Sequence, residues 1–274
     1  MNNSIDNDDI KLQLIEKVGH IIMDRPPHNY TDLKFLKSLA DQFESCQSSN
    51  LRAILLSSTG KNFCAGADFS KGGVGSDDPQ DIADSDIEPV KKFERDTNAF
   101  YYQALRIINC NLPIVCLIQG AAVGAGLGLA LAADYRIGTE NAKFSAPFVK
   151  LGIHPGFGLT YLLPKLIGHA NATDMLLTGR RVLAKEGLSM GLLNRIVSQD
   201  QLLNTGIEIA TQMADNAPLA VAATKKTLNY QTVKKVQKIL LHELSQQVQL
   251  ITTKDAAIGI EASLNRTTPK FSGQ

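Results

Sequence analysis

The sequence predicts an α/β fold, with a core of strands and helices followed by a mostly helical C-terminal region. First, the uncharged apolar run 114–118 leads into a glycine-rich turn and then an apolar helix, as when a buried strand feeds a helix. Second, the chain is predicted to be helical from about Gln201 onward, apart from a turn at 216–218. We therefore divide the chain into a core at 1–200 and a helical region at 201–274, which packs on the core or on a neighbouring subunit.

The first half of the core alternates between strand and helix patterns. Paired prolines at 26–27 exclude helix between the second strand and the first helix. The predicted elements are strand 10–14 paired with strand 18–23, loop 25–30, a helix capped by Thr31 with its apolar face from Leu33 to Phe43, strand 51–57 and loop 61–70.

The second half begins with a segment, 71–90, that is rich in Gly, Asp, Ser and Pro. This composition predicts a flexible segment, either a lid or a solvated loop without a role. The elements predicted after it are helix 89–109, a strand from Pro113, strands 135–138 and 142–145, loop 147–158, a helix from about Leu159, and a last strand 194–198.

Composition excludes several classes of function. The 28 Lys and Arg nearly balance the 27 Asp and Glu, so nothing predicts binding to nucleic acid or to an anionic membrane. The four cysteines form no C-x-x-C pair and no zinc-ligand spacing, which predicts reduced thiols, no metal site and a cytoplasmic protein. Cys64 is interpreted as a small packing residue.

A membrane span is also not expected. The N-terminus is polar and acidic and has no apolar signal core. The uncharged stretch 112–133 is long enough to cross a bilayer, but it contains Pro113, Gln119 and four glycines and lacks aromatic flanks. It is better interpreted as a buried strand followed by a buried helix.

The glycine-rich stretch 120–134 is the strongest candidate for a functional motif. Backbone N–H groups at a helix start can bind an anion or a developing oxyanion. The stretch contains no acid before Asp134 and no Lys, Ser, Thr or His, and it matches no nucleotide-binding fingerprint. The alternative is that its glycines only allow another backbone to approach closely.

Three motifs in register resemble the crotonase (enoyl-CoA hydratase/isomerase) superfamily. They are Cys64-Ala-Gly-Ala-Asp68, the run 119–126, and Phe144-Ser-Ala-Pro147 with Pro155-Gly-Phe-Gly158. The resemblance extends from about Ile10 to the terminal Pro269-Lys-Phe271. It implies a spiral of ββα turns, a C-terminal helical trimerisation region, and assembly as a trimer or a dimer of trimers.

The resemblance also implies an acyl-CoA thioester substrate and no permanently bound cofactor. Its carbonyl oxygen would lie between two backbone N–H groups, which by position are those of Ala67 and Ala125. Coenzyme A would contact residues from two parts of the chain, the second part from this or a neighbouring subunit: Arg25, His28, Ala65, Gly66, Ala67 and Asp68 near the N-terminus, and Lys270 and Phe271 at the C-terminus.

The acidic residues that hydratases and isomerases of this superfamily use are missing. The two hydratase glutamates would stand at Gly128 and Phe148, and the acid of a double-bond isomerase at Gly156. General acid–base groups contribute about 10²–10⁴-fold each to rate. Ordinary hydration by the two-glutamate route should therefore be severely impaired.

Other side chains are candidates for the missing role, although each also has a purely structural interpretation. Asp68 can stabilise a turn, and His154 can be a packed or solvent-facing residue. Some polyketide-pathway decarboxylases of the superfamily use a lysine from the region of Lys91 and Lys92. The full set is Asp68, His154, Lys91 or Lys92, and, as residues lining the acyl pocket, Tyr101 and Tyr102; His242 is expected at the surface.

Three functions remain open. The first is an enzyme of the enoyl-CoA hydratase/isomerase group that catalyses isomerisation, decarboxylation or weak hydration. The second is a decarboxylase acting on a thioester of coenzyme A or of an acyl-carrier protein. The third is a non-catalytic acyl-CoA binder.

Overall fold

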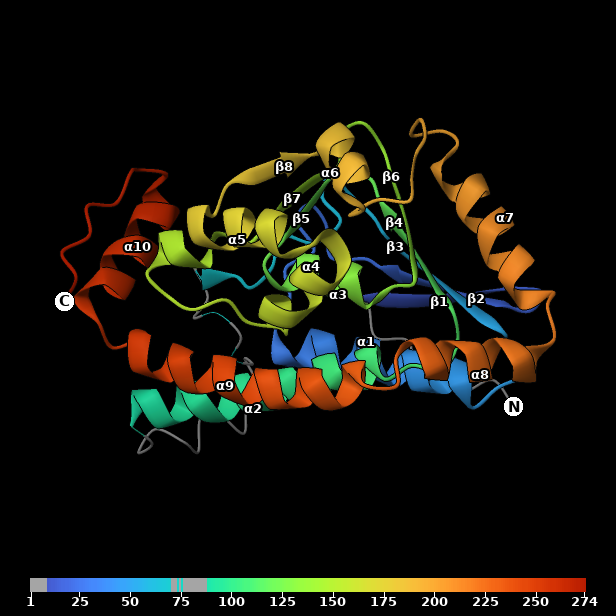
Figure 1. Cartoon of the computed structure of the whole chain (residues 1–274), viewed down its shortest axis with the longest axis horizontal. Coiled ribbons are helices and arrows are strands. Elements are labelled where there is room, and N and C mark those ends of the chain that lie inside the picture. The colour runs from blue at the N-terminus through green and yellow to red at the C-terminus, as the bar shows by residue number, and fades with distance from the viewer. Residues whose placement is uncertain (1–8, 70–72, 74, 76–87) are drawn as a thin grey trace.

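A six-stranded sheet forms the centre of the computed structural model, which describes residues 9–69, 73, 75 and 88–274 (Figure 1). Its strand order is β1-β2-β3-β4-β6-β9; β1 is antiparallel to β2 and the remaining neighbours are parallel. The strands are β1 (Ile10–Ile15), β2 (Val18–Met23), β3 (Ala53–Ser58), β4 (Ile114–Ile118), β6 (Tyr135–Gly138) and β9 (Arg195–Ile196). A smaller sheet has the order β5-β7-β8, from β5 (Ala121–Val123), β7 (Lys143–Ser145) and β8 (Arg181–Leu183).

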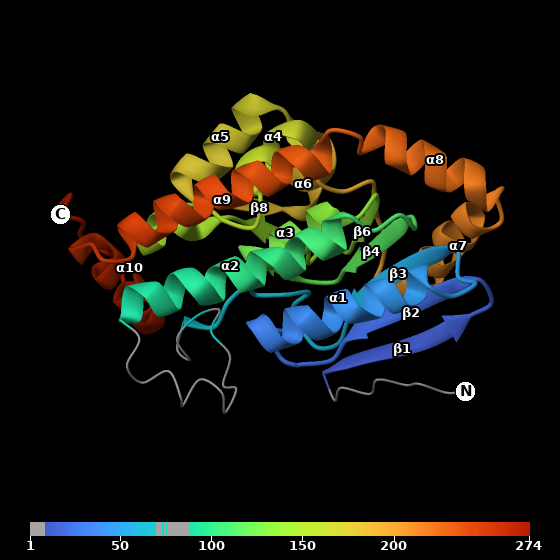
Figure 2. The same cartoon turned by 90° about the horizontal axis from the view of Figure 1, so that it is seen from below.

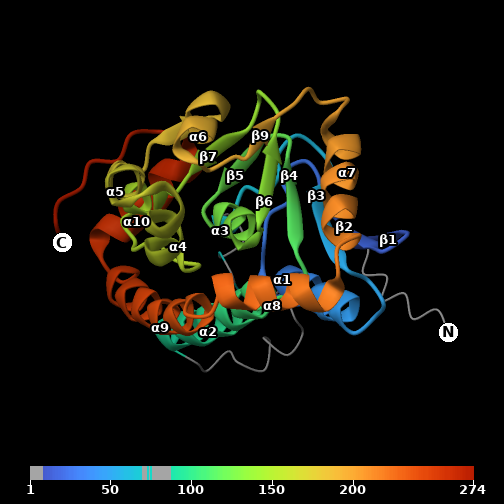
Figure 3. The same cartoon turned by 45° about the vertical axis from the view of Figure 1, so that its right-hand side comes forward.

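Helices cover both faces of the large sheet, which explains why β4 is apolar at every position. Helix α7 (Leu202–Ala214) packs on the face that carries Leu55, Val115 and Leu117. The other face packs against α1 (Leu33–Gln47), α2 (Pro89–Ile108) and α3 (Ala125–Ala132), as Figure 3 shows. Three short helices, α4 (Leu159–Ile167), α5 (His169–Thr178) and α6 (Ala184–Met190), follow α3.

Three helices make up the rest of the C-terminal region. They are α8 (Pro218–Leu228), α9 (Thr232–Leu250) and α10 (Lys254–Asn265). Helix α9 lies along α2 (Figure 2), and α10 packs against the 3-10 helix Pro147–Leu151. A Cβ on Gly259 would lie only 2.4 Å from the Leu151 carbonyl carbon, so the absence of a side chain permits this contact.

Most predicted elements are confirmed, and the differences are local. The N-cap of α1 is Asp32, whose carboxylate accepts from the Phe35 N–H at 2.8 Å, so the prediction of Thr31 was wrong. Strand β5 lies inside what was predicted as turn, and loop 147–158 begins with a 3-10 helix. Most of segment 71–90 lies outside the described residues.

Two further predictions concern the state of the cysteines and a membrane span. All four cysteines are buried and free. Burial raises the pKa of Cys64 to about 12, so its thiol is a poor nucleophile at neutral pH. Among the described helices, none combines the length and apolar character needed to cross a bilayer.

Candidate functional site

At the candidate site, the backbone of loop 64–68 lies very close to the backbone of β5 and of the start of α3. Loop 64–68 runs beside β5: the Cys64 N–H donates to the Ala121 carbonyl at 3.0 Å, and the Val123 N–H donates to the Cys64 carbonyl at 2.9 Å. A Cβ on Gly126 would lie 2.1 Å from the Cys64 carbonyl oxygen. The glycines therefore do allow a second backbone to approach, and this approach brings the two motifs together.

The junction places Ala67 and Ala125 in the lining of one cavity of about 720 Å³. Ala125 is the first residue of α3, and the first helical bond runs from the Gly128 N–H to the Gly124 carbonyl at 3.0 Å. Ala67 lies on the facing loop and also lines the cavity. Among the described residues, neither N–H has a backbone acceptor. These donors, one of them at a helix N-terminus, suit a negatively charged oxygen.

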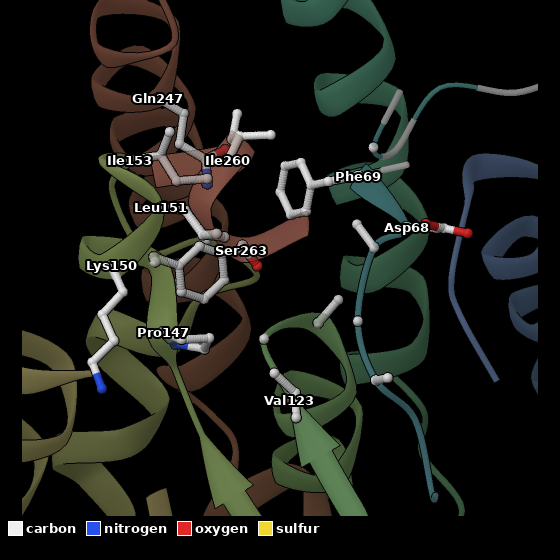
Figure 4. A pocket seen from close by; sticks show the side chains of 18 of the residues that line it. Asp68, Phe69, Val123, Pro147, Lys150, Leu151, Ile153, Gln247, Ile260 and Ser263 are labelled. Carbon is white, nitrogen blue, oxygen red and sulfur yellow. The ribbon is translucent and has the colours of Figure 1, made fainter. Parts of the chain in front are cut away.

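The rest of the cavity is mainly apolar, and its size is in the range of small-molecule sites. Figure 4 shows Phe69, Leu151, Ile153 and Ile260 turned toward its interior. The full apolar lining of large side chains is Phe69, Phe93, Phe100, Val123, Phe148, Leu151, Ile153, Phe157, Ile251, Ile260 and Leu264.

Aromatic side chains fill the space beside two of the three positions at which the resemblance places catalytic acids in other family members. A Cβ on Gly128 would lie 2.2 Å from Cδ1 of Phe157, and a Cβ on Gly156 would lie 1.9 Å from the Tyr101 hydroxyl oxygen. Phe148 lines the cavity at the third position. A glutamate at position 128 or 156 therefore does not fit without displacement of these rings.

Asp68 follows the first amide donor, but its carboxylate is directed away from the cavity interior (Figure 4). It lies between the main cavity and a second, polar cavity of about 380 Å³, and it lines both. Burial, and then the charge of Asp68, raise the pKa of Tyr30. Lys150 also lines the main cavity and points away from its centre in the same figure.

His154 does not line the main cavity, although its neighbours Ile153 and Gly156 do. Its Nδ1 donates to the Pro155 carbonyl at 2.6 Å, which leaves Nε2 as the acceptor nitrogen. Burial lowers the pKa of His154, and its ring meets exposed His242 edge-on at a centroid distance of 6.2 Å. The structure thus places the imidazole behind the cavity wall.

The two lysine candidates lie on α2, outside the described residues that line the cavity. Lys91 pairs with Glu88 at 3.7 Å. Tyr101 lines the cavity and is buried, whereas Tyr102 is 63% exposed. The helix therefore presents only one of its two adjacent tyrosines to the site.

The expected coenzyme A contacts fall into three groups. Ala65, Gly66 and Ala67 line the main cavity, while Arg25 and His28 line the second one. The Arg25 guanidinium is already held by the carboxylates of Asp9 and Asp32, both at 2.6 Å. Lys270 and Phe271 lie exposed on the C-terminal tail.

Sequence reasoning missed a hydrogen-bond chain that crosses the cavity wall. The Tyr101 hydroxyl donates to Oε1 of Gln247 at 2.8 Å, and Nε2 of Gln247 donates to the His154 carbonyl at 2.8 Å. Burial, and then nearby Glu243, raise the pKa of Tyr101 well above its usual value. A separation of 146 residues hides the Tyr101–Gln247 pair from any sequence motif.

Arg266 was also missed. It ends α10 in the left-handed conformation and lines the cavity beside Thr267 and Pro269. No local motif marks it, because only the packing of α10 brings it to the site.

Comparisons of the sequence and of the fold with known proteins point to one family. The family model described as enoyl-CoA hydratase/isomerase matches residues 14–274. Carnitinyl-CoA dehydratases of Salmonella paratyphi A and Salmonella typhi are 32% identical over 260 residues, covering 93% of this chain and 94% of theirs. A crystal structure of an enoyl-CoA hydratase/isomerase from Pseudoalteromonas atlantica aligns with a TM-score of 0.80 and 28% identity, covering 96% of this chain and all of that one. An enoyl-CoA hydratase structure from Bacillus halodurans gives a TM-score of 0.81 and 26% identity, covering 93% and 99%.

Proposed function

Because this chain belongs to the enoyl-CoA hydratase/isomerase family, we propose that it binds an acyl-CoA thioester and stabilises its enolate with the N–H groups of Ala67 and Ala125. The observation that carries the proposal is that Ala67 and Ala125 both line an apolar cavity and that neither N–H has a backbone acceptor among the residues the structure describes. An enolate concentrates negative charge on the thioester oxygen, and one preorganised donor is worth about 10²–10³-fold in rate.

The coenzyme A portion would follow the backbone of Ala65 and Gly66 out of the main cavity. No permanently bound cofactor is part of the proposal. His28, Lys270 and Phe271 remain candidates for the nucleotide end, and Arg266 joins them because it lines the cavity. Arg25 contributes by shaping the second cavity, since two carboxylates already occupy its guanidinium.

Carbonyl polarisation can be tested without knowing the natural reaction. Cinnamoyl-CoA should bind with its absorption band shifted to longer wavelength, because the amides draw electron density onto the carbonyl oxygen. S-Phenylpropyl-CoA, which lacks the carbonyl, should bind more weakly. Gly126→Ala should abolish the shift by forcing loop 64–68 away from α3, whereas Gly75→Ala, whose added Cβ would meet its nearest neighbour at 3.5 Å, should keep it. Binding of cinnamoyl-CoA without any shift would contradict the proposal.

Hydration is expected to be slow, because the positions of the three family acids hold Gly128, Phe148 and Gly156. Crotonyl-CoA and carnitinyl-CoA belong in the assay panel. Carnitinyl-CoA is included because the relatives at 32% identity are carnitinyl-CoA dehydratases. Efficient turnover of crotonyl-CoA would contradict the view that these positions impair hydration.

Decarboxylation of an acyl thioester is the second candidate. It is favoured because Asp68, the only carboxylate among the described lining residues, points out of the cavity. Loss of CO₂ generates an enolate without a base, so the amides can do most of the work. The lysine route from Lys91 or Lys92 has less support, because neither lines the described cavity. Binding of CoA esters without turnover across the whole panel would instead indicate a non-catalytic binder.

Self-association as a trimer or a dimer of trimers is part of the proposal. It is supported by apolar side chains that α8 leaves exposed, with Leu219 at 86% and Leu228 at 72%. Replacing both leucines with glutamine should reduce the oligomer mass in light scattering, and an unchanged mass would place the interface elsewhere.

A further inference from the structure

Tyr101 is a titratable side chain in the cavity wall to which the proposed function assigns no role. It lies on the same face of α2 as Phe93 and Phe100, which also line the cavity. Its hydroxyl stands where a side chain at position 156 would begin, 1.9 Å from an added Cβ. Gly156 is therefore the feature that admits the phenol.

The phenol is held in place by Gln247. Oε1 of Gln247 accepts the Tyr101 hydroxyl hydrogen bond at 2.8 Å, and the Gln247 amide is itself fixed by its bond to the His154 carbonyl at 2.8 Å. Gln247 is 5% exposed, so the pair is built into the cavity wall and does not depend on a surface side chain.

We propose that the Tyr101 hydroxyl is the proton donor to the α-carbon of the thioester enolate, with Gln247 as its positioning residue. This inference rests on the proposed function, because the enolate must be held at Ala67 and Ala125. The substrate class is a thioester that carries a carboxylate on its α-carbon, a malonyl-type acyl-CoA, whose enolate forms without a base.

The bonds in the two steps balance. The bond between the α-carbon and the carboxylate breaks, its electron pair forms the enolate, and CO₂ leaves. The Tyr101 hydroxyl then rotates about its C–O bond from Gln247 to the α-carbon. A C–H bond forms, the O–H electron pair stays on the phenolate, and water entering through the cavity returns the proton.

The environment suits a phenol as an acid and not as a base. Burial, and then the Glu243 carboxyl, favour the neutral phenol at physiological pH. Among the described residues, neither His154 nor His242 lines the cavity, and the two cations that do, Lys150 and Arg266, come from the 3-10 helix 147–151 and from the end of α10. The α-carbon of a thioester enolate is a much stronger base than a phenolate, so transfer proceeds even from a weakly acidic hydroxyl.

The test uses 2-butylmalonyl-CoA in D₂O with the full-length protein. The wild-type protein should release hexanoyl-CoA with one deuterium and a single configuration at C2, because one group delivers the deuteron. Tyr101→Phe should lower kcat by about 10²–10⁴-fold and give racemic product. Gln247→Met should give a smaller loss with partial racemisation. The matched control Tyr102→Phe, on the exposed side of the same helix, should change neither quantity.

Cinnamoyl-CoA separates the two proposals. Tyr101→Phe should retain its red shift, since the amides are untouched; a wild-type protein without the shift would reject the proposed function. A wild-type protein that shows the shift but releases no hexanoyl-CoA overturns the assignment of Tyr101. So does a Tyr101→Phe variant that keeps both the rate within about threefold and the configuration. Should Tyr101→Phe fail to fold by circular dichroism, Gln247→Met with unchanged stereochemistry overturns it.

Discussion

The absence of a side chain at Gly128 determines which group can pack against the start of α3. Gly128 lies one turn into α3, and the ring of Phe157 occupies the space that its Cβ would take, 2.2 Å away. Phe157 in turn meets Phe100 in a T-shaped contact with a centroid distance of 5.8 Å. The loss of an acid at this position is therefore coupled to aromatic packing and is not an isolated substitution.

Gly128→Glu alone should not restore hydration. The new side chain would clash with Phe157, and such overpacking costs about 1–3 kcal/mol. In the double variant Gly128→Glu/Phe157→Ala, the carboxylate has room, and hydration of crotonyl-CoA should rise by about 10²-fold. Thermal melting and a spectrophotometric hydration assay measure both effects. Equal activity of the single and double variants would show that Phe157 is not the obstacle.

Arg25 should matter more to stability than to ligand affinity. Its guanidinium is 28% exposed and bonds to Asp9 and Asp32, so Arg25→Gln leaves two carboxylates without their cation. Hydrogen bonds to charged groups contribute about 1.5–3 kcal/mol, and partial exposure places this loss near the lower end. Denaturant unfolding should detect it, while the Kd of cinnamoyl-CoA changes less than about threefold. Lys270→Gln should show the opposite pattern, since Lys270 is exposed on the tail.

At the scale of elements, periodicity predicts those whose burial is one-sided or complete. The alternating β1 and the fully apolar β4 were both recognised, and α2 differs from its prediction by one residue at its end. Strand β5 was missed because Ala121-Ala-Val123 lies between glycines and is defined only by pairing with β7 and Cys64. Thr31 and Asp32 are both good caps, and only the backbone geometry decides between them.

Helix α4 gives a pH-dependent prediction, because a buried glutamate from α9 caps it. The Glu243 carboxylate accepts from the Gly158 N–H at 2.7 Å and the Thr160 N–H at 3.0 Å. Burial nevertheless raises the pKa of Glu243 to about 7. A carboxyl with a raised pKa in the folded state stabilises the protein below its unfolded pKa, and this stability is lost as the pH rises toward 7.

The unfolding free energy of the wild-type protein should therefore fall between about pH 4.5 and pH 7 relative to that of Glu243→Gln. Urea unfolding of both proteins across this range measures the difference. Titrations of His20 and His154 cancel in the comparison where the substitution leaves them unchanged. A difference that is constant with pH would contradict the raised pKa.

For the whole molecule, the helical C-terminal region could be predicted but its position could not. The sequence predicts helix from about Gln201 onward, yet nothing in it says that α9 lies along α2 and supplies Gln247 to the cavity. The same holds for α10, which brings Ile260 and Arg266 to the site. The short motifs 64–68 and 119–126 can be recognised in the sequence and predict the amide half of the proposed site, whereas the other half comes from residues that no motif marks.

The Asp255 side chain should hold the C-terminal tail in place together with the bonds that residues 254 and 255 make to Gln274. Asp255 accepts from the Ser272 N–H at 2.7 Å and the Gly273 N–H at 2.8 Å, and the intervening Thr267 and Pro269 line the cavity. Asp255→Ala should accelerate amide hydrogen exchange across 267–274 and weaken cinnamoyl-CoA binding several-fold. Glu261→Ala, at an exposed position of the same helix, is the control. Unchanged exchange in Asp255→Ala would show that other contacts hold the tail.

The bond between Tyr101 and Gln247 also has a consequence for biosynthesis. A growing chain leaves the ribosome from its N-terminus, so every strand of both sheets is made before residue 247 emerges. The Tyr101 hydroxyl therefore lacks its Gln247 partner until α9 packs against α2. A chain terminated before residue 247 would contain Ala67, Ala125 and Tyr101 but lack Gln247, so the phenol gains this hydrogen-bond partner only after α9 has been made.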